Sequence, residues 1–199
     1  MLYKYLKMSE IYLIRHGQST WNSERRWTGQ ANPPLTEIGR QQAILACEKF
    51  QEMDFSAVTS SSLQRARETA SIIAERLKLK LLAPISDLNE RQAGEIDGLT
   101  SDEIEKRFPG LLDKWRKGEI IDIPGGENWD AFIKRVQNGL QALSLISGRI
   151  LAVSHEGILR AIEYLSGENQ RKHENLEGRW ITISYTLPNS ADLKSRAAD

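Results

Sequence analysis

Two of the three histidines in this chain stand where a predicted β-strand gives way to a loop or a helix. Residues 11–14 (Ile-Tyr-Leu-Ile) form a short apolar run of strand-forming residues, and His16 follows this run closely. Residues 149–154 are the most strand-like run, and they end directly before His155. Ligands of open parallel sheets bind beyond the carboxyl ends of the strands. Both histidines therefore indicate a ligand site at one edge of such a sheet.

Helical patterns alternate with these strands. Thr36 is the predicted N-cap of an amphipathic helix over residues 37–53. The serines at positions 60–62 are expected to cap a second helix over residues 63–77. Further expected elements are a strand at 57–60, an extended segment at 80–83, short helical pieces over 100–119, helices over 127–145 and 158–165, and a strand over 180–187. This alternation predicts an α/β sandwich with a mostly parallel sheet.

The length of 199 residues fits a single domain, which we expect to span residues 1–199. Met8 directly precedes the first strand, so residues 1–8 are a candidate extension, and residues 188–199 are expected to be a loose tail. The formal charge is zero, which disfavours nucleic-acid or membrane partners. The chain shows no apolar run long enough for a membrane span and no secretion signal, so we expect a cytoplasmic protein. Cys47 is expected to be a small core residue.

Phosphoryl transfer without a metal ion requires three kinds of group. Cationic donors must surround the phosphate oxygens, and arginine suits this because its planar fork binds two oxygens at once. A nucleophile must attack phosphorus, which a neutral imidazole nitrogen can do near pH 7. A carboxylic acid must protonate the departing oxygen. In this chain Arg15, His16, Arg65, Glu90 and His155 could supply these groups, although each local pattern is weak alone.

Five segments resemble the motifs of one enzyme family, and they occur in the family order. They are Arg-His-Gly-Gln-Ser-Thr-Trp-Asn at 15–22, Leu-Thr-Glu-Ile-Gly-Arg-Gln-Gln-Ala at 35–43, the serine-arginine segment at 60–70, Leu-Asn-Glu with following glycines at 88–98, and Val-Ser-His at 153–155. Together they resemble the histidine phosphatase superfamily, also called the phosphoglycerate mutase-like family. The resemblance implies a three-layer α/β/α sandwich with a short insertion over the active site. It implies neither a metal nor a cofactor.

The resemblance also implies roles for matched residues. His16 would become phosphorylated, and Glu90 would act as general acid and then as the base that activates water. Phosphate contacts are expected from Arg15, Asn22, Arg65 and His155, and substrate contacts from Thr28 and Gly29. Arg67 is expected to lie at the surface.

One position departs from the family pattern, because Glu156 stands where glycine usually follows the second histidine. A carboxylate that points inward would repel a phosphate. Three interpretations remain open: Glu156 points away, it favours the charged form of His155, or it changes which substrates fit. His173 lies in a charged run over residues 168–177, and we assign it no role.

The family divides between phosphatases and mutases. The insertion between Glu90 and Arg149 is short, and its basic residues are offset by acidic ones. We therefore expect a phosphomonoester hydrolase acting on a small phosphorylated metabolite. A phosphoglycerate-mutase-like phosphomutase is the alternative, supported by Thr28 with Gly29 and by Trp115 with Arg116. A non-catalytic phosphate-binding module is the third hypothesis.

The identity of the substrate and the oligomeric state remain open at this stage. Trp115, Ile120, Ile121 and Ile123 could form a partly apolar lid over the pocket. No P-loop or dinucleotide fingerprint occurs, so a bound nucleotide cofactor is not implied.

Overall fold

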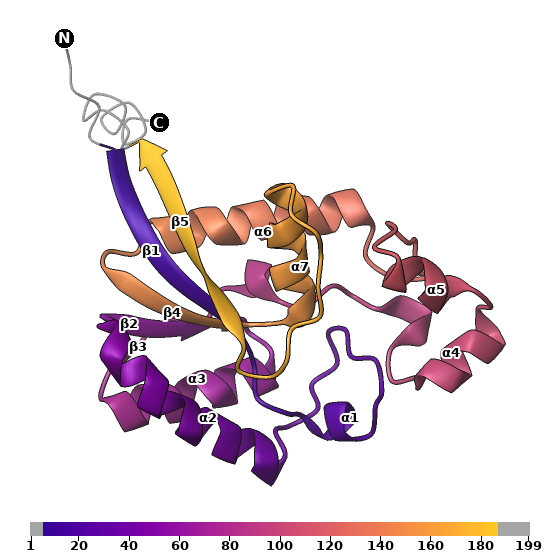
Figure 1. Ribbon diagram of the computed structural model, residues 1–199, viewed down its shortest axis with the longest axis horizontal. Coiled ribbons are helices and arrows are strands. Elements are labelled where there is room, and N and C mark those ends of the chain that lie inside the picture. Colours follow the sequence, from indigo (N-terminus) through magenta and orange to yellow (C-terminus); the bar gives the residue numbers. More distant parts are fainter. Residues whose placement is uncertain (1–5, 187–199) are drawn as a thin grey trace, which may run out of the picture.

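A computed structural model of the protein describes residues 6–186, in which five strands form one sheet in the order β3-β2-β4-β1-β5 (Figure 1). The strands are β1 (Leu6–Arg15), β2 (Ala57–Ser60), β3 (Lys80–Leu81), β4 (Arg149–Ser154) and β5 (Gly178–Thr186). The first four are mutually parallel, and β5 pairs antiparallel with β1. The predicted mostly parallel sheet is confirmed.

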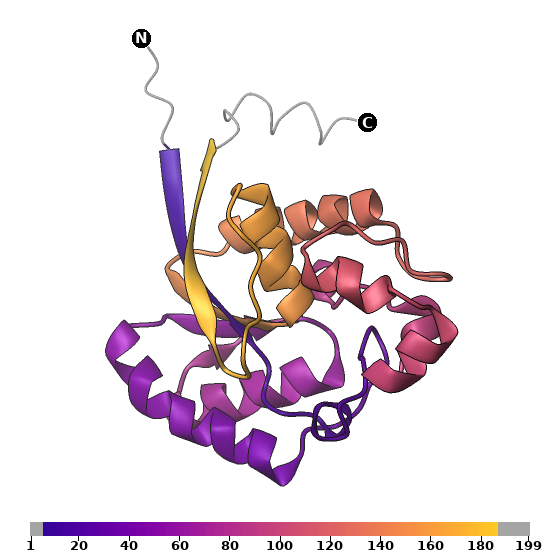
Figure 2. The ribbon, with the colours of Figure 1, turned by 45° about the vertical axis from the view of Figure 1, so that its right-hand side comes forward.

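Helices cover both faces of this sheet (Figures 1 and 2). They are α1 (Thr20–Ser23), α2 (Glu37–Phe50), α3 (Gln64–Leu77), α4 (Ser101–Arg107), α5 (Leu111–Arg116), α6 (Trp129–Ser144) and α7 (Glu156–Leu165), with 3₁₀ turns η1 (Gln51–Met53), η2 (Ser86–Leu88) and η3 (Gly94–Ile96). Successive side chains of a strand face opposite sides. Ile11 and Leu13 of β1 accordingly pack with α6 and α7, whereas Tyr12 and Ile14 pack with α2 and α3. This burial on both faces explains the continuous apolar run of the strand.

Three predicted strands have other bounds in the structure, and one of them is β5, which begins at Gly178 instead of residue 180. β1 begins at Leu6, so part of the expected extension belongs to the strand, where β5 supplies a pairing partner. β3 is limited to Lys80–Leu81 instead of residues 80–83. The expected tail at 188–199 lies outside the described residues.

The predicted serine cap of α3 is also wrong, because the N-cap residue is Leu63 and it makes no side-chain capping bond. The three hydroxyls have other partners. Ser60 donates to the carbonyl of Ser61, Ser61 bonds to His155, and Ser62 donates to Asn89. The three serines therefore bind residues at the end of the sheet and do not cap the helix. The Thr36 cap of α2 is confirmed by its bond from the N–H of Gly39 at 3.0 Å.

The insertion that carries α4 and α5 has a small core of its own, made by Ala93, Ile96, Ile104 and Leu112. In Figure 1 it projects on the same side of the molecule as α1. Trp27, from the loop after α1, meets Trp115 of α5 with ring centroids 4.9 Å apart. None of the helices described is long and apolar enough to cross a bilayer. Cys47 is buried in the core as expected.

Candidate active site

Three neighbouring parallel strands bring their carboxyl ends to one edge of the sheet. His16 follows β1, His155 follows β4, and Ser61 follows β2. The ladder continues beyond the strands, since the N–H of His16 donates to the carbonyl of Ser154 at 3.0 Å. The imidazole rings of His16 and His155 have centroids 5.2 Å apart. The two histidines therefore lie together although 139 positions separate them in the sequence.

The tautomer of His16 follows from its two partners. Its Nδ1 lies 2.6 Å from the carbonyl oxygen of Gly17, which can only accept a hydrogen bond. The Nε of Arg65 donates to His16 Nε2 at 3.0 Å. Burial lowers the pKa of His16 well below its ordinary value, and the charges of Arg65 and Arg15 lower this pKa further. His16 is therefore neutral, with its proton on Nδ1 and a lone pair on Nε2.

Arg65 is fully buried, and the carbonyl groups of a single loop fix its guanidinium. Its Nη1 donates to Ala31 at 2.7 Å and its Nη2 donates to Gly29 at 2.9 Å. Burial lowers the pKa of Arg65 to about 10, so it stays cationic at neutral pH. The N–H of Gly29 donates to Asp97 at 2.8 Å, so Gly29 links Asp97 through its N–H to Arg65 through its carbonyl. Arg67 is exposed, as expected.

Arg15 lies at the end of β1 with 13% of its side chain exposed. Its Nη1 donates to the carbonyl of His173 at 2.6 Å and lies 3.0 Å from Glu156 Oε2. Glu156 therefore points toward the site and pairs with Arg15. The hypothesis that Glu156 favours charged His155 is wrong, because burial, with Arg65 and His16, lowers the pKa of His155. Burial raises the pKa of Glu156, and the charge of Arg15 opposes this shift.

His155 is fully buried beside His16. Its Nε2 lies 2.7 Å from Ser61 Oγ, and this oxygen accepts a hydrogen bond from the N–H of Leu63 at 3.3 Å. The hydroxyl of Ser61 can donate to His155 Nε2, and in that tautomer the imidazole proton lies on Nδ1. That Nδ1 has no hydrogen-bond partner among the residues described.

Glu90 is held by two backbone donors. Arg91 N–H donates to Oε1 at 2.8 Å, and Gly157 N–H, in the first turn of α7, donates to Oε2 at 3.1 Å. A Cβ at position 157 would lie 2.0 Å from Glu90 Oε1. A glycine at this position thus allows the carboxylate to approach the helix.

Arg135 of α6 is a further site residue, and none of the sequence motifs indicates it. Its Nη1 donates to the carbonyls of Asp87 and Asn89 at 3.0 and 2.7 Å, and Nη2 donates to that of Glu90 at 3.2 Å. Two further bonds, at 2.8 and 2.7 Å, join Arg135 to the carboxylate of Glu127. Arg135 therefore fixes the loop that carries Glu90, and only the position of an arginine within a predicted helix could have indicated it.

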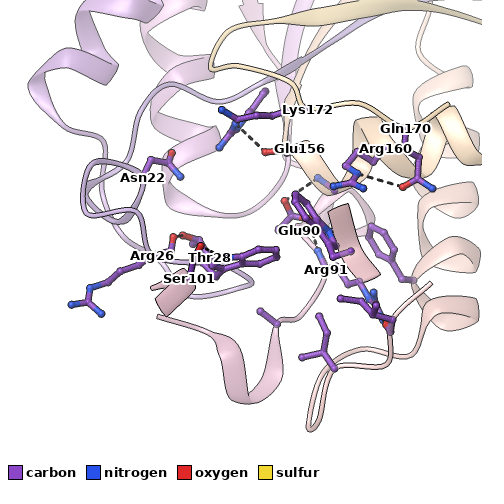
Figure 3. A pocket seen from close by; sticks show the side chains of 18 of the residues that line it. Asn22, Arg26, Thr28, Glu90, Arg91, Ser101, Glu156, Arg160, Gln170 and Lys172 are labelled. Atoms are coloured by element: carbon purple, nitrogen blue, oxygen red, sulfur yellow. Dashed lines mark hydrogen bonds and ion pairs between the residues drawn. The ribbon is translucent and has the colours of Figure 1, made fainter. Parts of the chain in front are cut away.

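A cavity of ≈ 620 Å³ lies at this edge of the sheet, and Figure 3 shows Asn22, Thr28, Glu90 and Glu156 among the side chains that line it. Its lining includes the predicted site residues Arg15, His16, Asn22, Thr28, Arg65 and Glu90. All four residues of the predicted apolar lid line it as well, namely Trp115, Ile120, Ile121 and Ile123. The guanidinium of Arg160 lies 4.1 Å from the ring centroid of Trp115. Within the described range, no three His, Cys, Asp or Glu side chains are grouped so that they could hold a metal ion.

A family model described as the histidine phosphatase superfamily (branch 1) matches residues 11–185. The chain belongs to this superfamily. The resemblance inferred from the motifs is thereby confirmed, and it is a superfamily of phosphatases and mutases.

Relatives within the superfamily have different activities. A 2,3-bisphosphoglycerate-dependent phosphoglycerate mutase of Bartonella henselae is 34% identical over 94% of this chain and 96% of its own length. A metal-independent phosphoserine phosphatase of Arabidopsis thaliana is 34% identical over 78% of this chain and 68% of its own. Among solved structures, a mycobacterial glucosyl-3-phosphoglycerate phosphatase in complex with VO3 is 25% identical, with a TM-score of 0.76 over 90% of this chain and 99% of its own.

Proposed function

We propose that this protein is a phosphomonoester hydrolase that acts through a phosphohistidine at His16 and needs no metal ion. The observation that carries the proposal is the pair formed by His16 and Arg65. A neutral imidazole presents the lone pair of Nε2 beside a buried guanidinium. A nucleophile and a cation that can stabilise the phosphoryl oxygens are thus adjacent.

The reaction follows in two steps. Nε2 of His16 attacks phosphorus while the bond from phosphorus to the alcohol oxygen breaks, and Glu90 in its acid form protonates that oxygen. Arg65 Nε moves its hydrogen bond from Nε2 to a phosphoryl oxygen. Glu90, now a carboxylate, then takes a proton from water, whose oxygen attacks phosphorus. The P–N bond breaks, and its electron pair returns to Nε2.

The remaining predicted residues complete the phosphate site in this proposal. Arg15 binds phosphoryl oxygens, His155 donates from Nδ1, and Asn22 and Thr28 contact the substrate from the cavity wall. Gly29 acts through its carbonyl on Arg65 and not by touching the substrate.

The cavity is much larger than a phosphate group needs, and its lining includes Trp115, Ile120, Ile121 and Ile123 of the insertion. We expect the alcohol half of the substrate to lie beside these residues and to carry an apolar or aromatic portion. The substrate is a small phosphorylated metabolite in this proposal.

A phosphomutase is the second candidate, because the Bartonella relative matches over nearly its whole length. The charges of the insertion favour hydrolysis instead. Arg107 pairs with Glu95 and Arg116 pairs with Asp113 at 2.9 Å, and neither arginine lines the cavity where a second phosphate would bind.

The decisive experiment measures phosphate release from a panel of phosphomonoesters, including 3-phosphoglycerate, with a chelator present. Release that survives the chelator and disappears in His16→Ala, by at least about 10³-fold, is the expected result. Isomerisation of 3-phosphoglycerate that depends on a bisphosphate primer would favour the mutase. Anion binding without release or isomerisation would favour a binding module.

A further inference from the structure

A segment late in the sequence, residues 171–177, lies against the end of β1 and holds its backbone. The N–H of Leu176 donates to the carbonyl of Arg15 at 3.0 Å. The side-chain amide of Asn175 donates to the carbonyl of His16 at 2.8 Å. Leu176 adopts φ 61°, a left-handed conformation that is unfavourable for a leucine. The backbone is therefore locally strained where this segment contacts Arg15 and His16.

A buried hydrogen-bonded pair of side chains anchors the segment to α7. His173 is fully buried and Glu163 is 3% exposed. His173 Nε2 lies 2.8 Å from Glu163 Oε1, and Glu163 Oε2 accepts the N–H of Arg171 at 3.1 Å. Both carboxylate oxygens therefore fix the backbone that includes the carbonyl of His173.

That carbonyl determines which edge of Arg15 remains free. Nη1 of Arg15 is bound to the His173 carbonyl and to Glu156. The opposite edge of a guanidinium carries Nε–H and an Nη2–H side by side, in the spacing that matches two phosphate oxygens. Nε of Arg15 is buried and, among the residues described, has no hydrogen-bond partner. A buried donor without a partner indicates that a ligand supplies the acceptor.

We infer that the buried His173–Glu163 pair is a positioning unit for phosphate binding, which holds the carbonyl of His173 so that Arg15 presents its Nε and Nη2 edge to the phosphate. This inference rests on the proposed function of the same site. The inference gives a role to His173, the one histidine that does not follow a strand. Residues 171–177 then belong to the active site, although they come after the last of the five family motifs in the sequence.

The test measures binding of inorganic orthovanadate by calorimetry and KM for an aryl phosphate. His173→Ala should weaken orthovanadate binding and raise KM by about tenfold each, with a smaller change in kcat, because Arg15 contacts the phosphoryl group before and during the reaction. His173→Gln, which can still donate to Glu163, should recover most of the loss. If His173→Ala does not fold, His173→Phe fills the same volume without the hydrogen bond and should show the same loss.

A double-mutant cycle separates positioning from a general loss of stability. In an Arg15→Ala background, His173→Ala should add almost nothing to the loss of binding. Ser9→Ala is the matched control, because it removes a buried 2.8 Å bond to the carbonyl of Ser144 and should leave binding unchanged. Additive losses in the cycle, or unchanged binding in folded His173→Ala and His173→Phe, would overturn the inference. Wild-type protein that binds orthovanadate but hydrolyses no phosphomonoester would overturn the proposed function and leave the inference standing.

Discussion

The reactivity of His16 depends on which ring nitrogen carries its proton. The carbonyl of Gly17 requires a proton on Nδ1, and the guanidinium of Arg65 requires a lone pair on Nε2. Both demands are met by the neutral imidazole that burial favours. Glu90 and Glu156 lie in the same cavity with different partners, because backbone N–H groups hold Glu90 whereas Arg15 holds Glu156.

Glu90→Gln should lower kcat/KM far more for alkyl phosphates than for aryl phosphates. An aryl oxide leaves without much protonation, whereas an alkoxide needs the acid, so we expect a loss of about 10²–10⁴-fold for alkyl esters. Steady-state kinetics on both ester classes measure the difference. Glu95→Gln is the control, since Glu95 is a neighbouring acid paired with Arg107. Equal losses for the two classes would rule out Glu90 as the acid.

Glu156→Gln should strengthen binding of sulfate, an anion whose charge is constant above pH 3, by about three- to tenfold at pH 7.5. The substitution removes a negative charge near the pocket, and glutamine can still accept from Arg15. Because the pKa of Glu156 is raised, wild-type protein should bind sulfate more weakly as the pH rises through that pKa. Competition kinetics at increasing pH from 4.5, the ordinary pKa of a glutamate, should show this dependence in wild type and lose it in the variant. Weaker binding by Glu156→Gln at every pH contradicts this account.

At the scale of elements, the insertion with α4 and α5 closes the outer cavity but shares little of the main core. Polar and aromatic contacts attach it to the rest of the molecule. Arg91 donates to the carbonyls of Ile121 and Glu127 at 3.0 Å each, and Trp115 contacts both Trp27 and Arg160. We expect an element that shares so little of the main apolar core to open locally before the sheet unfolds.

Trp115→Ala should therefore speed hydrogen exchange of α5 and raise KM for bulky aryl phosphates by about three- to tenfold, while KM for a small alkyl phosphate changes little. Exchange mass spectrometry and kinetics measure the two effects. Trp180→Ala removes a tryptophan that packs on Tyr12 and Phe55 instead, so it should lower the melting temperature without changing KM. If Trp115→Ala raised KM for the aryl and the alkyl phosphate by the same factor, Trp115 would have no role in holding the alcohol half of the substrate.

At the scale of the whole molecule, three neighbouring parallel strands end at the same edge of the sheet, and this brings His16, Ser61 and His155 together. This arrangement buries two histidines whose pKa values are both lowered. In the unfolded chain they bind protons near pH 6.5, whereas in the folded protein they stay neutral to lower pH.

The free energy of unfolding should accordingly fall as the pH drops below about 6.5, by up to about 1.4 kcal/mol per pH unit for each histidine. The unfolded state binds more protons in this window, so the stability is present above it and is lost on acidification. Urea unfolding between pH 7.5 and 5 measures the slope. His155→Phe should reduce the slope by about one proton, and an unchanged slope would show that His155 is protonated in the folded state.

The alternation of strands and helices, the histidines at strand ends and the family motifs could all be predicted from the sequence. Each of these features depends on residues that are close together along the chain. Burial of one face of a helix, or of one or both faces of a strand, determines the spacing of its apolar residues. For the same reason the motif blocks around Arg15, Arg65, Glu90 and His155 were recognisable one by one. Their grouping at one edge followed from the rule for parallel sheets and from the resemblance.

Only the tertiary structure decided how these groups are held. Arg15 is oriented by His173, 158 positions away, and Glu90 by Gly157 and Arg135. The serines predicted to cap α3 bind His155 and Asn89 instead. A carbonyl, a lone buried histidine or a helical arginine has no local pattern that distinguishes it from its many counterparts elsewhere. These hydrogen-bond partners depend on the relative positions of chain segments that come together only in the folded protein.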